Sequence, residues 1–148
     1  MQERLRPGRW YPWQMLTACA LLNRTRGAQA RPAIFALLAD APDPRSLLDL
    51  GEDGLRERLR PLGLWRRRAA SLRALALACE GGVPRDPRGL PGVGQYALDS
   101  WALFVEAVGP LRRPPDDDKL RRFDEWLRRL RGEPLLRQLR SLRRATTR

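Results

Sequence analysis

The chain has 148 residues, of which 43% are hydrophobic, which suits one domain with a buried core and excludes a wholly disordered protein. Its 29 lysines and arginines against 17 aspartates and glutamates give a net charge of +12, which favours a polyanionic partner. No segment approaches the roughly 18 consecutive apolar residues of a transmembrane helix, and the first residues lack the apolar stretch of a secretory signal.

Helical periodicity recurs along the chain and strand-like alternation is missing, so the sequence predicts an all-α fold. The first helix spans residues 13–22 and is apolar on almost every face, which predicts a position in the middle of the fold. Short helices follow at residues 32–38, 45–50 and 52–59. A longer helix at residues 65–80 ends at two glycines and carries an apolar stripe formed by Ala69, Leu72, Ala76 and Cys79.

A glycine-rich segment at residues 90–96 comes next, with the sequence Leu90-Pro91-Gly92-Val93-Gly94-Gln95-Tyr96. Two glycines around an aliphatic residue permit a tight turn with a bare backbone. Because Gly94 opens the next helix, free N–H groups and the helix dipole favour an anion there, and a DNA phosphate suits so basic a protein. The alternative is an ordinary turn between two helices.

Beyond a helix at residues 97–108, a cluster of aspartates precedes a helix at residues 119–130, in the sequence Pro114-Pro115-Asp116-Asp117-Asp118-Lys119-Leu120. Capping is one explanation, because Asp117 or Asp118 can cap this helix while the other aspartates are solvated. A catalytic carboxylate is the other, since loss of a base leaves positive charge on the sugar, which an ionised aspartate stabilises. A last helix is predicted at residues 134–143, with a frayed tail at residues 145–148.

The distribution of charge and the number of cysteines restrict the partners and cofactors that we expect for this chain. An anionic membrane surface is the rival partner, but the arginines fall in many predicted helices and form no single basic amphipathic segment. We therefore expect nucleic acid and no membrane. The sequence has no histidine and two cysteines, Cys19 and Cys79, in apolar helical patterns. We expect both to be buried in a reducing compartment, with no metal and no other cofactor.

Residues 90–96 resemble the hairpin of the helix–hairpin–helix (HhH-GPD) DNA glycosylase superfamily. Two positions after the last glycine, its bifunctional endonuclease III and oxoguanine members have a lysine that forms a Schiff base with the sugar. This chain has Tyr96 there, like the thymine–guanine mismatch glycosylases, including the methyl-CpG-binding domain 4 type. The resemblance implies a compact two-lobed helix–hairpin–helix fold over residues 1–148, and removal of a base without strand cleavage.

Further motifs in the same order carry the resemblance along most of the chain. Asp117 matches the essential aspartate of the methyl-CpG-binding domain 4 type, with Asp116 as the preceding acid and Lys119 near the end of the motif. Asp118 stands where that type has histidine. The other matching segments are Pro12-Trp13-Gln14-Met15-Leu16, Leu22-Asn23-Arg24-Thr25, Pro61-Leu62-Gly63-Leu64 and Asp124-Glu125-Trp126-Leu127.

The resemblance implies a role for each matching residue. Asp117 and Tyr96 would be catalytic, Arg24 would fill the space left by a flipped nucleotide, and Leu64 would wedge into the opposite strand. Gln2 would read the flipped base, although its distance along the chain from Pro12 exceeds that in the family. The other residues expected to bind DNA are Leu90, Gly92, Val93, Gly94, Gln95 and Lys119. We also expect phosphate contacts from the arginines at positions 66–68 and 121–122.

The function implied is that of a monofunctional glycosylase acting on double-stranded DNA. It would flip out thymine, uracil or a 5-modified uracil mispaired with guanine and hydrolyse the N-glycosidic bond with the help of Asp117. A glycosylase for another damaged base, a non-catalytic DNA-binding module and a basic structural protein are the alternatives. We expect a monomer, cytoplasmic and nucleoid-associated in a prokaryote or nuclear in a eukaryote.

Overall fold

The computed structural model describes residues 8–107 and 109–130, and within them the predicted all-α fold is confirmed, with helices and turns but no strand. Gln2, the predicted helix at residues 134–143 and the tail at residues 145–148 lie outside the described residues. The helices are α1 (Tyr11–Leu22), α2 (Gly27–Asp40), α3 (Pro44–Asp49), α4 (Gly51–Leu59), the 3-10 turn η2 (Arg60–Leu62), α5 (Trp65–Cys79), α6 (Gln95–Ser100), the π-helical turn η3 (Trp101–Val105) and α7 (Asp118–Arg129).

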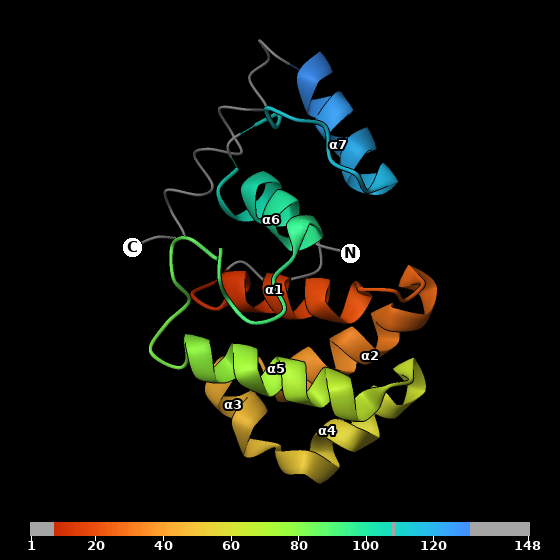
Figure 1. The fold of residues 1–148 in the computed structure, drawn as a ribbon, viewed down its shortest axis with the longest axis vertical. Helices are drawn as coiled ribbons and strands as arrows, with labels where there is room; N and C mark the ends of the chain where they lie inside the picture. The colour runs from red at the N-terminus through yellow and green to blue at the C-terminus, as the bar shows by residue number, and fades with distance from the viewer. Residues whose placement is uncertain (1–7, 108, 131–148) are drawn as a thin grey trace.

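Helix α1 lies at the centre, between α2 to α5 on one side and α6 and α7 on the other (Figure 1). It contacts α2, α5, α6 and η3, and buries side chains on several faces, among them Trp13, Met15, Leu16, Ala18 and Leu21. A helix can be apolar all round only when it is enclosed in this way. The central position predicted for this segment is confirmed, and the two helical groups correspond to the expected two lobes.

The larger group forms around α5. Its predicted stripe, Ala69, Leu72, Ala76 and Cys79, is buried, and α3 and α4 pack against this helix. Leu47 of α3 and Leu55 of α4 are fully buried in the same core. Cys19 and Cys79 are both buried free thiols, as predicted. In the part of the chain that the structure describes, no helix is both long and apolar enough to cross a bilayer.

The second helix begins earlier than predicted. The sequence pattern placed its start at Pro32, whereas α2 starts at Gly27 and contains Pro32 in its interior. Pro32 cannot donate the hydrogen bond that this position normally makes to the carbonyl four residues earlier. Ala30 is nonetheless completely buried on the same face as Ile34 and Leu37. Burial of this extra turn outweighs the lost hydrogen bond.

The helix predicted at residues 97–108 is shorter and less regular than expected. It comprises α6 and the π-helical turn η3, and ends at Val105. Ala107 has a left-handed backbone with φ 45°, and Gly109 follows with φ 91°. These conformations cannot continue a right-handed helix, so the chain turns back towards α7. There, Leu103, Leu120 and Leu127 form a small second core, against which Phe104 and Phe123 stack.

Two leucines on α5 test the packing of the larger core. Leu72→Ala removes a side chain that is 1% exposed, and we expect unfolding to become easier by about 2–5 kcal/mol because a cavity remains. Leu77→Ala, on the same helix at a site 61% exposed, is the matched control and should change stability by less than about 0.5 kcal/mol. Chemical denaturation of both variants measures this difference, and equal effects would contradict the packing described for α5.

Candidate active site and DNA-binding surface

Asp117 is the N-cap of α7. Its backbone is extended, and its Oδ1 accepts hydrogen bonds from the backbone N–H groups of Lys119 and Leu120, both at 3.0 Å. Of the two capping candidates, the structure therefore selects Asp117, while Asp118 is the first helical residue. Both bonds use one carboxylate oxygen, and no other described residue donates a hydrogen bond to Oδ2. This second oxygen is available to a ligand on an exposed side chain that the cap holds in place.

Arg121 supports the loop that carries Asp117. Its Nε donates to the carbonyl of Pro115 at 3.1 Å, and one terminal nitrogen donates to the carbonyl of Asp116 at 2.9 Å. Its other terminal nitrogen lies 3.3 Å from the carboxylate of Asp118. The phosphate contact expected of Arg121 stays a prediction, and in the structure its guanidinium binds the protein's own backbone.

Asp124 anchors the beginning of the same loop. Its carboxylate is 1% exposed and accepts a hydrogen bond from the backbone N–H of Leu111 at 2.6 Å and another from Nε of Arg128 at 2.9 Å. Arg128 also donates to the carbonyl of Leu111. Sequence reasoning placed Asp124 in a matching motif but gave it no role. The available signal was its helical spacing from Leu120 and Leu127, which puts a carboxylate on the apolar side of α7.

The hairpin docks on α5. Gly92 has φ 75°, and a Cβ at this position would lie 3.1 Å from Oγ of Ser71, so glycine suits both the backbone and the close approach. The turn closes through a hydrogen bond from the N–H of Val93 to the carbonyl of Leu90 at 3.2 Å. Gly94 is the N-cap of α6, and Tyr96 lies in the first turn of this helix. Phosphate binding by the hairpin stays a prediction.

Tyr96 lies where the two cores meet, because its half-buried ring packs against both of them. Burial, and after it negative charge at Cys19 and Asp117, raises the pKa of Tyr96 to about 12. Burial likewise raises the pKa of Cys19 to about 12, so this thiol is neutral at pH 7. The two predicted catalytic residues, Tyr96 and Asp117, therefore lie within electrostatic range of each other.

Arg24 and Leu64 share an uncommon backbone. Both have left-handed conformations, with φ 54° at Arg24 and φ 49° at Leu64, and Ala107 is the only other non-glycine residue with positive φ among residues 8–107 and 109–130. Such a conformation costs about 1 kcal/mol or more. Leu64 is also 73% exposed, more than any other large hydrophobic side chain reported for the described residues. Strain and exposure at these two predicted insertion residues suit contact with a partner.

Side chains also connect the hairpin and α7 to neighbouring elements. Gln95 donates from Nε2 to Asp99 at 2.7 Å, and Asp99 lies 4.0 Å from Arg113 in the loop before Asp117. Asp99 is 8% exposed, and sequence reasoning missed it. The ammonium of Lys119 lies beside the start of α2, 3.6 Å from where a Cβ on Gly27 would stand. Its charge thus adds to the positive end of the α2 dipole.

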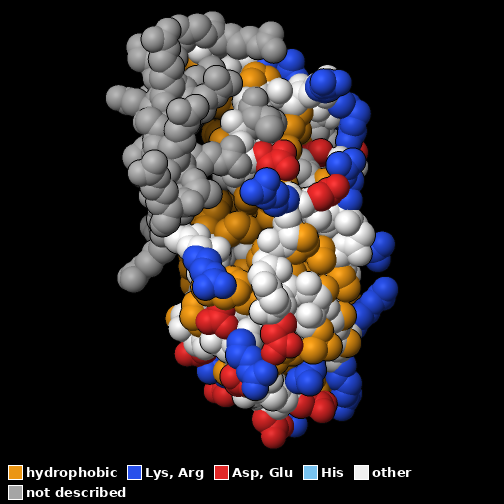
Figure 2. All heavy atoms as spheres, turned by 90° about the vertical axis from the view of Figure 1, so that its left-hand side faces the viewer, with side chains coloured by type: hydrophobic (Ala, Val, Ile, Leu, Met, Phe, Trp, Pro, Cys, Tyr) orange, Lys and Arg blue, Asp and Glu red, His pale blue; other side chains and the backbone are white. Residues whose placement is uncertain are grey.

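Charge is unevenly distributed over the surface. Figure 2 shows basic side chains along one edge of the molecule, and acidic side chains interspersed with basic ones at its lower end, where Figure 1 places α3 and α4. The acidic residues of this region are Asp43, Asp49, Glu52, Asp53 and Glu57. Arg45, Arg56 and Arg58 of the same helices form ion pairs with carboxylates, so we expect DNA to approach the molecule away from α3 and α4.

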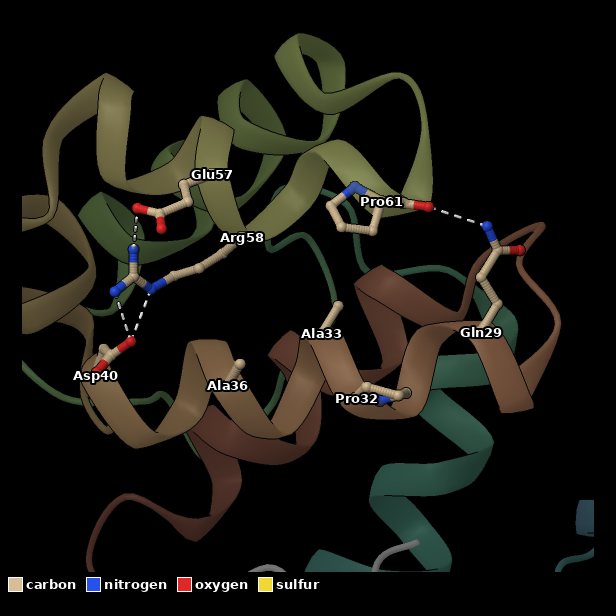
Figure 3. Close-up of a pocket in the computed structure, with 8 residues that line it drawn as sticks. All are labelled: Gln29, Pro32, Ala33, Ala36, Asp40, Glu57, Arg58 and Pro61. Atoms are coloured by element: carbon tan, nitrogen blue, oxygen red, sulfur yellow. Dashed lines mark hydrogen bonds and ion pairs between the residues drawn. The ribbon is translucent and has the colours of Figure 1, made fainter.

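A pocket between α2 and α4 is distinct from the site at Tyr96. Arg58 crosses it to Asp40, with 2.6 Å between their charged atoms, so its charge is already paired (Figure 3). None of the predicted site residues lines this pocket, and half of its lining residues are small and apolar; the lining residues are Gln29, Pro32, Ala33, Ala36, Asp40, Glu57, Arg58 and Pro61. We therefore do not assign it to a flipped base.

Comparison with known protein families identifies the superfamily of this chain. The sequence profile of the HhH-GPD superfamily of base excision DNA repair proteins matches residues 17–145. The chain belongs to this superfamily. The match runs from the middle of α1 through the hairpin and α7, so it includes Arg24, Leu64, Tyr96 and Asp117. The resemblance stated from the sequence motifs is confirmed.

Individual relatives agree with this HhH-GPD assignment. A methyl-CpG-binding domain protein 4-like protein of Arabidopsis thaliana is 32% identical over 84% of this chain and 28% of its own length. A thymine-DNA glycosylase of Aeropyrum pernix is 37% identical over 67% of this chain and 47% of its own. A thymine/uracil-DNA glycosylase of Pyrobaculum aerophilum is 32% identical over 62% and 43%. The chain thus spans less than half the length of each of these relatives.

Titration of the two tyrosines tests the burial of the site. Burial is the main cause that raises the pKa of both Tyr11 and Tyr96 from 10.0 to about 12. At pH 10 we expect almost no phenolate absorbance from the folded protein, and about half of the full signal once the chain is unfolded in guanidinium. Unfolded chains release these protons first, so the stability that the tyrosines contribute is complete below pH 10 and lost as the pH approaches 12. A half-maximal native signal at pH 10 would refute this burial.

Proposed function

We propose that this HhH-GPD chain is a monofunctional DNA glycosylase that acts as a monomer on double-stranded DNA. Its substrate would be thymine, uracil or a 5-modified uracil mispaired with guanine. The observation that carries this proposal is the cap at Asp117, which leaves one carboxylate oxygen available within electrostatic range of Tyr96. The names of the archaeal relatives, thymine-DNA glycosylase and thymine/uracil-DNA glycosylase, support the choice of base.

Binding would use the basic surface and the two strained loops. Arginine and lysine side chains neutralise phosphates, and the hairpin presents backbone N–H groups close to one strand. Flipping the target nucleotide leaves a gap in the duplex, which the guanidinium of Arg24 would fill. Leu64, already exposed, would part the stacked bases of the opposite strand without needing a hydrogen-bond partner.

The chemistry would then be hydrolysis of the bond between the sugar and the base. As this bond breaks, its electron pair leaves with the base and positive charge develops on the sugar, where the carboxylate of Asp117 stabilises it. Water then adds its oxygen to the sugar carbon, and the proton that the water loses neutralises the departing base, which gives an abasic site and a free base. Tyr96, with a pKa of about 12, is a neutral hydrogen-bond donor at pH 7. A phenol cannot form a Schiff base, which supports base removal without strand cleavage.

Incubation with defined duplexes tests the reaction. We expect duplexes with G·T, G·U or G·hydroxymethyluracil pairs to acquire alkali-labile sites, and the same strands to stay unbroken before alkali. Breaks before alkali would refute the monofunctional assignment. Binding to DNA without any alkali-labile site, on these pairs or on duplexes with oxidised or alkylated bases, would favour a non-catalytic DNA-binding module.

Two conservative variants test the carboxylate. Asp117→Asn keeps an oxygen that can cap α7 but removes the charge, so we expect excision to fall at least about 100-fold with folding and DNA binding retained. Asp116→Asn is the matched control, because it removes the same charge from the neighbouring exposed residue, and its rate should stay within a few-fold of the parent. Single-turnover rates on one mispaired duplex compare the two, and unchanged excision by Asp117→Asn would show that the carboxylate is wrongly assigned.

A further inference from the structure

The guanidinium of Arg68 donates three hydrogen bonds that connect two separate loops. From the first turns of α5, its Nε donates to the carbonyl of Gly63 at 3.1 Å. One terminal nitrogen donates to the carbonyl of Leu21 at 3.2 Å, and the other donates to Oγ1 of Thr25 at 2.7 Å. A single half-buried guanidinium thus holds the loop between η2 and α5 and the loop between α1 and α2.

Both loops carry a residue expected to enter DNA. Gly63 directly precedes Leu64, and Thr25 directly follows Arg24. Because Arg24 and Leu64 have left-handed backbones, each loop stores strain that its surroundings must balance. Arg68 bonds to a neighbour of each strained residue, so a shift of one loop is transmitted to the other through a rigid planar group.

A second contact joins the helical elements next to these loops, α2 and η2. Gln29, in the first turn of α2, donates from Nε2 to the carbonyl of Pro61 at 3.0 Å. This contact orients the beginning of the η2 turn, whereas Arg68 binds its end at Gly63. Two side chains therefore fix the relative position of the loops, and of the two only Arg68 bonds to immediate neighbours of both Arg24 and Leu64.

We propose that Arg68 is a positioning residue that couples Arg24 and Leu64, so that the two side chains enter the duplex as one preorganised unit. The proposal rests on the proposed function for the roles of these two residues. It assigns the positive charge of Arg68 to the protein's own oxygens, in contrast to the phosphate contact expected from sequence. Holding both loops before DNA arrives lowers the ordering cost of insertion.

Replacement of Arg68 by lysine separates the proposed positioning role from the effect of positive charge. Arg68→Lys keeps the positive charge but replaces a planar fork of five donors with one ammonium, which cannot reproduce the three bonds in their present directions. Arg73→Lys is the matched control, since Arg73 is an exposed arginine farther along the same helix. Circular dichroism at the assay temperature verifies that both variants are folded.

The experiment measures insertion of the side chains into the duplex, and its result does not depend on which base the protein excises. The probe is a duplex with a tetrahydrofuran abasic analogue in one strand and 2-aminopurine opposite it, whose fluorescence rises when the bases are unstacked. We expect a rise with the parent protein and with Arg73→Lys, and a rise at least about fivefold smaller at saturation with Arg68→Lys. The dependence of binding on salt should stay unchanged in Arg68→Lys, because the number of phosphate contacts is the same.

Coupling to the inserted side chain distinguishes positioning from a general structural effect. In a Leu64→Ala background, adding Arg68→Lys should reduce the fluorescence rise by less than about twofold, because Leu64, the positioned side chain that would unstack the 2-aminopurine strand, is gone. Additive losses, a full rise with Arg68→Lys alone, or no rise with the parent protein would each overturn the proposal. Failure of the proposed function would instead appear as absent excision by a parent protein that still raises the fluorescence of this probe.

Discussion

Burial of α1 between two groups of helices is the constraint on which the rest of the structure depends. Its side chains lie in the larger core, in which residues of α5 and α6 are also buried, so these two helices are placed relative to one another through a shared apolar neighbour. Cys19 of this helix lies near Tyr96, and the carboxyl end of the same helix leads directly into the loop of Arg24. The site is therefore as rigid as the packing around this one helix.

Around that apolar centre, the site loops are held largely by charged side chains bonded to backbone groups. Arg121 binds the carbonyls next to Asp117, Asp124 binds the amide that begins the same loop, and Arg68 binds the insertion loops. Irregular loops cannot satisfy their backbone groups as helices do, and side-chain donors and acceptors take over this task. Part of the large arginine content is thus structural, so net charge alone overstates the cations available to DNA.

The parts that sequence predicted are those specified by local patterns. Helical periodicity gave the buried stripe of α5 and the central place of α1, and a short motif identified the segment in which Asp117 caps α7. The parts it missed depend on partners far apart in the chain, such as the bond from Arg68 to Leu21 across 47 residues. The early start of α2 was missed for the same reason, because tertiary burial of Ala30 overrides the local signal of proline.

The left-handed backbones at Arg24 and Leu64 have a consequence for engineering and for evolution. Glycine adopts this conformation without steric cost, so replacement of either residue would relieve strain, against the greater conformational freedom that glycine gives the unfolded chain. The same replacement would delete a side chain suited to entering the duplex. Where the relief of strain is the larger effect, selection for stability alone would favour loss of these two side chains. Consensus design on this scaffold should therefore keep Arg24 and Leu64 unchanged.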